Sequence, residues 1–474
     1  MTDVPNTAAL ENEATTATSE VDGQTPERLY NARGQRVWRA GTLEYTRWGI
    51  ARLMFLLFIG QFTFVLEVTA LPMMLPLLYE QRGFTASEMG FLGIFAPLGA
   101  LVLFPILGYF SDRTRTRLGR RRPYDLIATP FWFIGLVIAP FTQSLELMIL
   151  ALALIGIAGA VNNVLTGFYN DVVPPELMGR FSGGMRFFGS IGVLGFQFGL
   201  LRFVDSSPVT VFLTVATVAF VCEMIMVIFV KEGEYPPPPR SKGFGTEIYN
   251  YIKEGFSSRY VIFLWLTLGV TALGAPAMGY YFVRYFTDDV HGLGMTSGQL
   301  GTLSGIGTAI GLCVTPFAGW LVDRVGPKLL WMWAGGMVGI VQIALFLLPQ
   351  TPGVISVLYG LFAFFNAGLT VGLLPIMFAT IPKERFGQLN GANQIVTRAF
   401  QIIASIGLGA FITFMGEDYR YAFLFGGVAY LGAPLFLILM LRQPYPYRNM
   451  PPSMSLEGGR RIGDMSRVVS PESA

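Results

Sequence analysis

The sequence is short of charge. Only 13% of its 474 residues are Asp, Glu, Lys or Arg, whereas a soluble domain has about 25%. Hydrophobic residues make up 53%, and they come in runs of about twenty or more, long enough to cross a hydrocarbon core of roughly 30 Å as helices. The composition excludes an ordinary soluble protein and indicates a polytopic membrane protein.

Histidine and cysteine are also scarce, which argues against several kinds of site. The one histidine is His291, and the two cysteines, Cys222 and Cys313, lie in apolar runs. We therefore expect no metal site and no disulfide framework. The formal net charge of +3 is too small to indicate nucleic-acid binding. Because no GxxxxGK[ST] segment or catalytic constellation is visible, neither an ATP site nor an enzyme is expected.

What the sequence does have is twelve apolar runs separated by polar or Gly/Pro-rich segments, each predicting a transmembrane helix. The expected helices are 47–79, 86–111, 123–142, 145–171, 180–204, 208–230, 259–287, 297–322, 327–348, 353–381, 387–415 and 419–441. They form two bundles, 47–230 and 259–441, joined by a polar cytoplasmic linker, 231–258. The tails, 1–46 and 442–474, are expected to be disordered and cytoplasmic.

Positive charge is concentrated in one set of loops. The segment "GYFSDRTRTRLGRRRPY" (108–124) places six arginines within ten positions, between two apolar runs. The linker and the other loops of the same set carry further Lys and Arg, and the alternate loops carry few. Since cytoplasmic loops are enriched in Lys and Arg, this pattern predicts that both termini are cytoplasmic. We expect a multi-pass protein of the cell (plasma or inner) membrane.

The two halves of the sequence repeat each other. The segment "GYFSDRTRTRLGRR" (108–121) is echoed by "GWLVDRVGPKLL" (319–330), and "PPELMGRFSGG" (174–184) is echoed by "PKERFGQLNGA" (382–392). The two repeated segments occur in the same order in each half, at nearly the same sequence offset. A duplicated six-helix unit is typical of transporters in which two bundles rock about a central site. The predicted fold class is therefore an all-α membrane protein with twelve transmembrane helices in two pseudo-symmetric six-helix bundles.

These motifs resemble those of a known family. The pattern G-x-x-x-D-R-x-x-x-R-x-G-R-R resembles the loop between helices 2 and 3 of the major facilitator superfamily, and the likeness extends over about residues 45–442. Within it, "SDRTRTRLGRRRPY" is similar to the sucrose–proton symporters, members of the glycoside–pentoside–hexuronide cation symporters. The segments "QFTFVLEVTALPMMLP" (61–76) and "YNDVVPPELMGR" (169–180) are similar to their first and fourth helices.

The resemblance implies a secondary transporter with the major facilitator fold, and more narrowly the proton-coupled symport of a sugar, such as a disaccharide or glycoside. Sodium-coupled melibiose-type relatives carry aspartates in helix 2, whereas this chain has no carboxylate between Glu88 and Asp112. A proton is therefore preferred to sodium. No cofactor is expected besides the co-transported proton.

Charged and polar residues inside membrane helices are candidates for function because burying them is costly. Asp171 is the leading candidate for binding both solute and proton, and the resemblance implies that it is the substrate-binding aspartate. Asn163 and Asn170 lie on the same stripe of the fourth helix. The alternative is that Asp171 only ends the helix beside the loop.

Four further charged residues lie inside the expected helices. Glu67 is a second possible protonation site, or the ion-pair partner of an arginine. Arg186 and Arg398 are equally compatible with substrate binding and with ion pairing. Glu223 is a weaker candidate, because its face of the helix fits a packed interface.

A further group of residues is expected to act in gating, because the repeat preserves its glycine and acidic positions. In the superfamily, such residues tie helix ends together on the cytoplasmic side in one conformation and release them in another. The expected gating residues are Gly108, Asp112, Arg113, Arg120, Asp323 and Arg324. The alternative is that the positive charge serves only to orient the helices in the membrane. That would account for the arginines but not for the recurrence of Gly108 and Asp112 at 319 and 323.

The expected partners are the lipid bilayer and a small polar solute, and the chain is expected to act as a monomer. Two alternatives stay open: a carrier of a non-sugar solute from the same superfamily, and a pigment-delivery or assembly-type membrane protein. The latter would need less polar lining in helices 1, 4 and 10. A membrane-bound enzyme is the most remote alternative.

Overall fold

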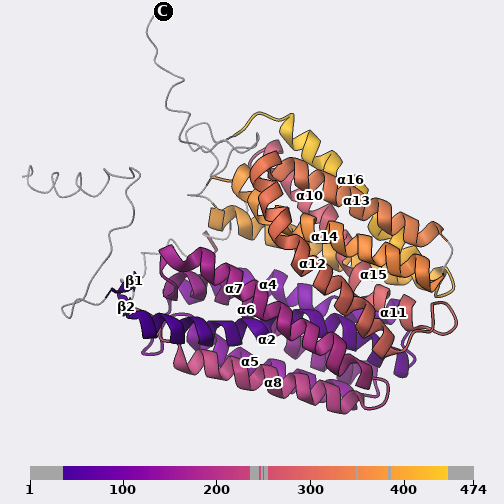
Figure 1. Ribbon diagram of the computed structural model, residues 1–474, viewed down its shortest axis with the longest axis horizontal. Helices are drawn as coiled ribbons and strands as arrows, with labels where there is room; N and C mark the ends of the chain where they lie inside the picture. The colour runs from indigo at the N-terminus through magenta and orange to yellow at the C-terminus, as the bar shows by residue number, and fades with distance from the viewer. Residues whose placement is uncertain are drawn as a thin grey trace, which may run out of the picture.

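The computed structural model describes residues 36–234, 245–246, 249, 253, 255–348, 351–382 and 386–446. Apart from one short hairpin, the elements of these ranges are helices. They fall into an N-terminal half, drawn in indigo to magenta in Figure 1, and a C-terminal half, drawn in orange to yellow. Most of the predicted linker and most of both predicted tails lie outside these ranges.

The N-terminal half contains seven named α-helices, because the second membrane crossing is broken in two. They are α2 (Arg47–Gln81), α3 (Ala86–Leu92), α4 (Phe95–Arg113), α5 (Arg122–Ile138), α6 (Leu145–Val172), α7 (Met178–Gly195) and α8 (Pro208–Phe229). Short turns extend the fifth crossing through η3 (Phe196–Leu200) and η4 (Leu201–Phe203).

The C-terminal half repeats this arrangement. Its elements are α10 (Arg259–Pro276), η5 (Ala277–Tyr281), α11 (Phe282–Thr287), α12 (Ser297–Val325), α13 (Pro327–Leu347), α14 (Pro352–Thr380), α15 (Phe386–Phe414) and α16 (Tyr421–Leu441). Here α10, η5 and α11 together form one crossing, of residues 259–287.

The predicted fold class is confirmed. Within the described ranges, eleven helical segments are long and apolar enough to cross a membrane. The twelfth is α6, in which the apolar stretch Leu145–Val161 is followed by a more polar part. The molecule is therefore a multi-pass membrane protein built from two six-helix bundles.

Local sequence signals account for where the helices begin. The side chains of Thr85 and Thr296 each accept a bond from a backbone N–H of the first turn, and Glu88 and Gln299 bond back to them as capping boxes. The turn between α12 and α13 requires Gly326, whose φ of 84° lies in the left-handed region.

The N-terminal tail is a correction to the sequence prediction. It was expected to be disordered up to residue 46, but β1 (Trp38–Ala40) and β2 (Leu43–Tyr45) pair as an antiparallel hairpin. The hairpin is fixed to the start of the linker, since Glu234 donates its backbone N–H to Thr42 Oγ1 at 2.8 Å. The tight turn between the strands uses Gly41, whose φ is 56°.

The two halves touch mainly at one end of the molecule. We call the end at which α2 starts and α16 stops the terminal end. The opposite end, at which the halves touch, is the far end. At the far end, α3 packs on α15, and α12 packs on η3 and η4. The approach is close: a Cβ on Gly90 would lie 2.3 Å from the carbonyl oxygen of Ser405. This arrangement leaves room between the halves toward the terminal end.

Candidate functional site

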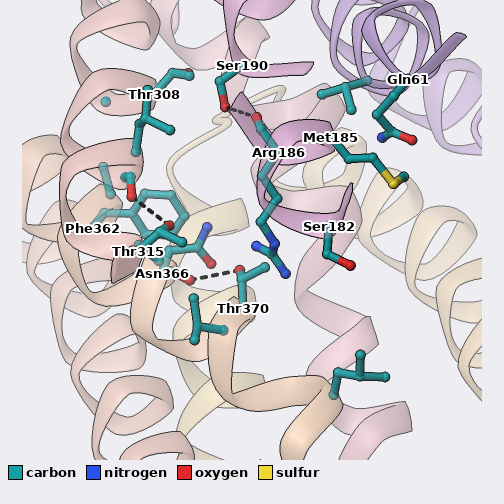
Figure 2. Close-up of a pocket in the computed structure, with 18 of the residues that line it drawn as sticks. Gln61, Ser182, Met185, Arg186, Ser190, Thr308, Thr315, Phe362, Asn366 and Thr370 are labelled. Atoms are coloured by element: carbon teal, nitrogen blue, oxygen red, sulfur yellow. Dashed lines mark hydrogen bonds between the residues drawn. The ribbon is translucent and has the colours of Figure 1, made fainter. Parts of the chain in front are cut away.

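A polar cavity lies between the two halves and opens toward the terminal end. Its volume is about 660 Å³, and residues of α2 and α7 face residues of α12 and α14 across it. Figure 2 shows these side chains directed into the cavity. The polar residues that line it are Gln61, Ser182, Arg186, Ser190, Thr308, Thr315, Asn366 and Thr370.

Among the lining residues that the structure describes, Arg186 alone carries a formal charge. Its side chain is exposed to the cavity and points toward Asn366 and Thr370 (Figure 2). Within the described part of the chain, no carboxylate lines the cavity and no acidic residue forms a salt bridge with Arg186. Its donors are therefore available to a solute, which fits the substrate-binding alternative better than the ion-pairing alternative.

Asp171 lies elsewhere, near the terminal end of α6. Its carboxylate accepts bonds from Arg120 Nη2 at 2.6 Å and from Arg121 Nε at 2.9 Å. Glu232, just after α8, accepts the backbone N–H groups of Arg120, Arg121 and Arg122 at the start of α5. These contacts tie α5, α6 and α8 together, and Asp171 is not among the cavity-lining residues. The prediction that Asp171 binds solute and proton has no geometric support in this conformation.

The other members of the predicted stripe on α6 cannot be placed. The side chains of Asn163 and Asn170 lie outside the described residues, as does that of Asp112 at the end of α4. Their predicted roles stay predictions.

The gating segments show a common geometry in the two halves. The guanidinium of Arg113 stacks 3.7 Å from the ring of Tyr109, and that of Arg324 stacks 4.4 Å from the ring of Trp320. In both cases the aromatic residue lies four positions before the arginine, so the duplication seen in the sequence extends to this contact. Asp323 is exposed beside Arg324.

The two glycines that begin these segments are open. A Cβ on Gly108 or on Gly319 would meet no atom within 4 Å. Neither glycine is therefore required by packing in this conformation. A conformation that closes the terminal end would give both a reason to be small.

Glu67 and Arg398 are both away from the cavity lining. Glu67 is 7% exposed and lies inside the N-terminal half. Arg398 donates from Nη1 to Gln401 Oε1 at 2.9 Å on α15. A direct contact of either residue with solute stays a prediction.

Ion pairs close the far end, and we call this group the far-end latch: Glu80, Arg284, Thr287, Asp288, Glu417 and Tyr419. Arg284 of the C-terminal half reaches Glu80 of the N-terminal half at 2.5 Å and Asp288 at 2.6 Å. Thr287 also donates to Glu80, at 3.0 Å.

A second contact of the latch joins Glu417 to the N-terminal half. Its carboxylate accepts the backbone N–H of Ala86 at 3.0 Å and the hydroxyl of Tyr419 at 2.8 Å. Burial raises the pKa of Tyr419 above its ordinary value, which keeps the phenol protonated as a donor. The latch joins the two halves at this end.

Sequence reasoning missed most of the lining. Gln61, Thr308 and Asn366 are single polar residues inside apolar runs, a signal that marks a candidate but not the direction in which it faces. It also missed Asp125, which lies at the start of the expected helix 123–142 and was not counted among the charges inside the helices.

The comparisons with known proteins agree with this architecture. The sequence profile described as Major Facilitator Superfamily matches residues 57–397 and 313–458. The general alpha-glucoside permease of Schizosaccharomyces pombe is 27% identical over 218 residues, which cover 41% of this chain and 37% of the permease. A sucrose transport protein of Oryza sativa subsp. indica is 30% identical over 123 residues, covering 25% and 22%. Multidrug resistance protein MdtG of Yersinia enterocolitica is 23% identical over 322 residues, covering 65% and 75%.

Solved structures share the fold at low identity. The nucleoside transporter NupG (D323A mutant) superposes with a TM-score of 0.65 at 14% identity, covering 82% of this chain and all of that one. A D-xylose–proton symporter superposes with a TM-score of 0.62 at 17% identity, covering 84% and 98%. The chain belongs to the Major Facilitator Superfamily and is a secondary transporter rather than an enzyme.

Proposed function

We propose that this protein is a proton-coupled symporter of a sugar, a disaccharide or glycoside, in the cell membrane, with both termini cytoplasmic. The observation that carries the proposal is the cavity of about 660 Å³, lined from both halves by hydroxyl and amide groups. Sugars are recognised by such groups, and the volume lies in the range of small-molecule sites, about 300–1,000 Å³.

Alternating access follows from the placement of the contacts. The far-end latch joins the halves, while the cavity opens toward the terminal end, which the arginine cluster assigns to the cytoplasm. Rocking the halves would break the latch and bring the gating segments of α4 and α12 together. The Arg113–Tyr109 and Arg324–Trp320 stacks lie where that closure would occur.

The residues that line the cavity also favour some of the alternative functions over others. A pigment-delivery or assembly role does not require the hydroxyl and amide groups contributed by both halves. An organic cation, a frequent multidrug substrate, would meet the charge of Arg186 with no carboxylate to offset it. Because Arg186 has free donors, one second candidate is favoured: a sugar that carries a carboxylate, such as a uronate.

Calorimetric titration of the purified protein with sucrose, maltose and glucuronate tests the proposal. We expect at least one sugar to bind, and Asn366→Leu to weaken it by about three- to tenfold, the loss of one neutral hydrogen bond. Ser356→Ala, on an exposed position of the same helix outside the cavity, is the matched control. Arg186→Gln separates the candidates, since it should affect glucuronate far more than sucrose. Binding of ethidium and of no sugar would refute the proposal.

A further inference from the structure

Three carboxyl groups are buried together inside the N-terminal half, and we call them the acid cluster: Glu67 of α2, Asp125 of α5 and Glu223 of α8. They are 7%, 2% and 5% exposed. Glu67 lies within electrostatic range of both other acids. Asp125 and Glu223 are close enough to share a hydrogen bond.

Asp125 and Glu223 have fewer donors than buried carboxylates require. Thr63 donates to Glu223 Oε2 at 2.8 Å. The Oδ2 atom of Asp125, however, is buried without a hydrogen-bond partner, and the Asp125 carboxyl lies beside the Glu223 carboxyl and Thr129. Within the described part of the chain, no Lys or Arg forms an ion pair with Asp125 or Glu223.

Such a pair is not stable with both groups ionised. An unpaired carboxylate in a low-dielectric interior takes up a proton rather than staying charged. Two carboxyl groups in contact disfavour double ionisation further, and commonly share one proton between them. The Oδ2 atom of Asp125, which has no hydrogen-bond partner, is therefore the atom at which a proton would bind.

We propose that Glu67, Asp125 and Glu223 form the binding site of the coupling proton, separate from the solute cavity and linked to it through α2. This assignment rests on the proposed function, because it names the site of the ion that drives the transport. It differs from a mechanism in which solute and proton meet on one carboxylate.

Helix α2 provides the link, because its two faces belong to the two sites. Gln61 and Val65 line the cavity. Thr63 lies two residues after Gln61, and Glu67 lies two residues after Val65. Each is therefore about 200° around the helix from its cavity-lining neighbour, and both face α5 and α8. Loss of the proton would place repelling charges between α2, α5 and α8, and the face of α2 that touches solute would move with them. Pro72 and Pro76 interrupt the hydrogen bonding of α2 beyond the cluster, which favours bending there.

Around Asp125 and Glu223, the residues that the structure describes include no compensating cation. Tyr169 of α6 lies within electrostatic range of all three acids, and Cys222 precedes Glu223 on α8. Arg122 of α5 is turned away and donates to backbone carbonyls of α8. On α7, Arg186 faces the solute cavity. The side chains of residues 162–167 of α6 lie outside the described residues.

Infrared difference spectroscopy tests proton binding without any solute. Purified protein is titrated in H₂O and in D₂O, and the C=O stretch of a protonated, D₂O-sensitive carboxyl is followed. We expect this band in the wild type and in Glu146→Gln, an exposed carboxyl at the far end that serves as control. The band should lose most of its intensity in the double variant Asp125→Asn, Glu223→Gln, in which Glu67 alone of the cluster keeps its carboxyl group. Persistence of the full band in a folded double variant would overturn the proposal.

Transport in proteoliposomes provides the second arm, with sucrose or maltose as the probe. Glu223→Gln should exchange solute down its gradient like the wild type, but should lose accumulation driven by a pH gradient. Thr63→Val, a milder change, should move the pH dependence of accumulation without abolishing exchange. Accumulation that follows a sodium gradient instead, with the cluster ionised in the infrared, would also overturn the proposal. If the wild type accumulates no sugar, the proposed function fails, and the infrared arm still decides whether the cluster binds the proton.

Discussion

The far-end latch makes a quantitative prediction about the conformational equilibrium. Glu80→Gln keeps the shape of the side chain but removes the ion pair with Arg284, where the two side chains are 30% and 9% exposed. Exposed pairs contribute about 0–1 kcal/mol and removal of one partner of a buried pair costs about 3–5 kcal/mol, so this half-buried pair contributes about 1.5 kcal/mol. Since Glu80 and Arg284 belong to different halves, the loss should shift the population toward a far-end-open state by about tenfold.

This shift can be followed by measuring the distance between two spin labels, after Cys222 and Cys313 are replaced by serine. The labels are placed at Ser206 and Val290, which are both exposed at the far end. We expect Glu80→Gln to add a longer-distance population. The matched control is Asp288→Asn, which removes a partner of Arg284 within the C-terminal half and leaves the contact between halves intact. An unchanged distribution in Glu80→Gln, or the same shift in both variants, would refute the latch.

Three further changes probe other parts of the account. Asp171→Asn should lower the melting temperature in detergent by removing about 2 kcal/mol of ion pairing with Arg120, while sugar affinity stays within a few-fold; the reverse pattern would return Asp171 to the solute site. Gly60→Ala should destabilise the protein by about 1–3 kcal/mol, because the new Cβ would lie 2.1 Å from Met226 Sδ, and Met226→Ala should rescue it. Gly108→Ala should leave the melting temperature unchanged but slow transport; unaltered transport would show that no close contact forms there.

Sequence reasoning reached the fold because membrane helices are set by length and hydrophobicity. The predicted segment 208–230 is α8, Pro208–Phe229, and the predicted segment 297–322 is the first part of α12, Ser297–Val325. The arginine cluster and the duplication followed from charge and spacing, which are readable in one dimension. The hairpin at residues 38–45 was missed because a polar tail with weak patterning gives no comparable signal.

The site was less accessible to prediction, because helices surrounded by lipid and by other helices carry little directional signal in their sequences. Gln61 and Thr63 are both polar and two residues apart, yet one lines the cavity and the other donates to Glu223. Asp171 was assigned to the solute from its helix stripe, whereas its partners, Arg120 and Arg121, come from a loop whose path the sequence does not specify. Only the packing of α8 against both α2 and α5 shows that Asp125 belongs with Glu67.

Uptake into proteoliposomes under an imposed pH gradient distinguishes proton-coupled symport from passive transport. With the interior alkaline and sucrose or maltose outside, we expect accumulation of the sugar above its external concentration, and loss of that accumulation when a protonophore collapses the gradient. Uptake that only equalises the two concentrations, or that ignores the protonophore, would contradict proton-coupled sugar symport.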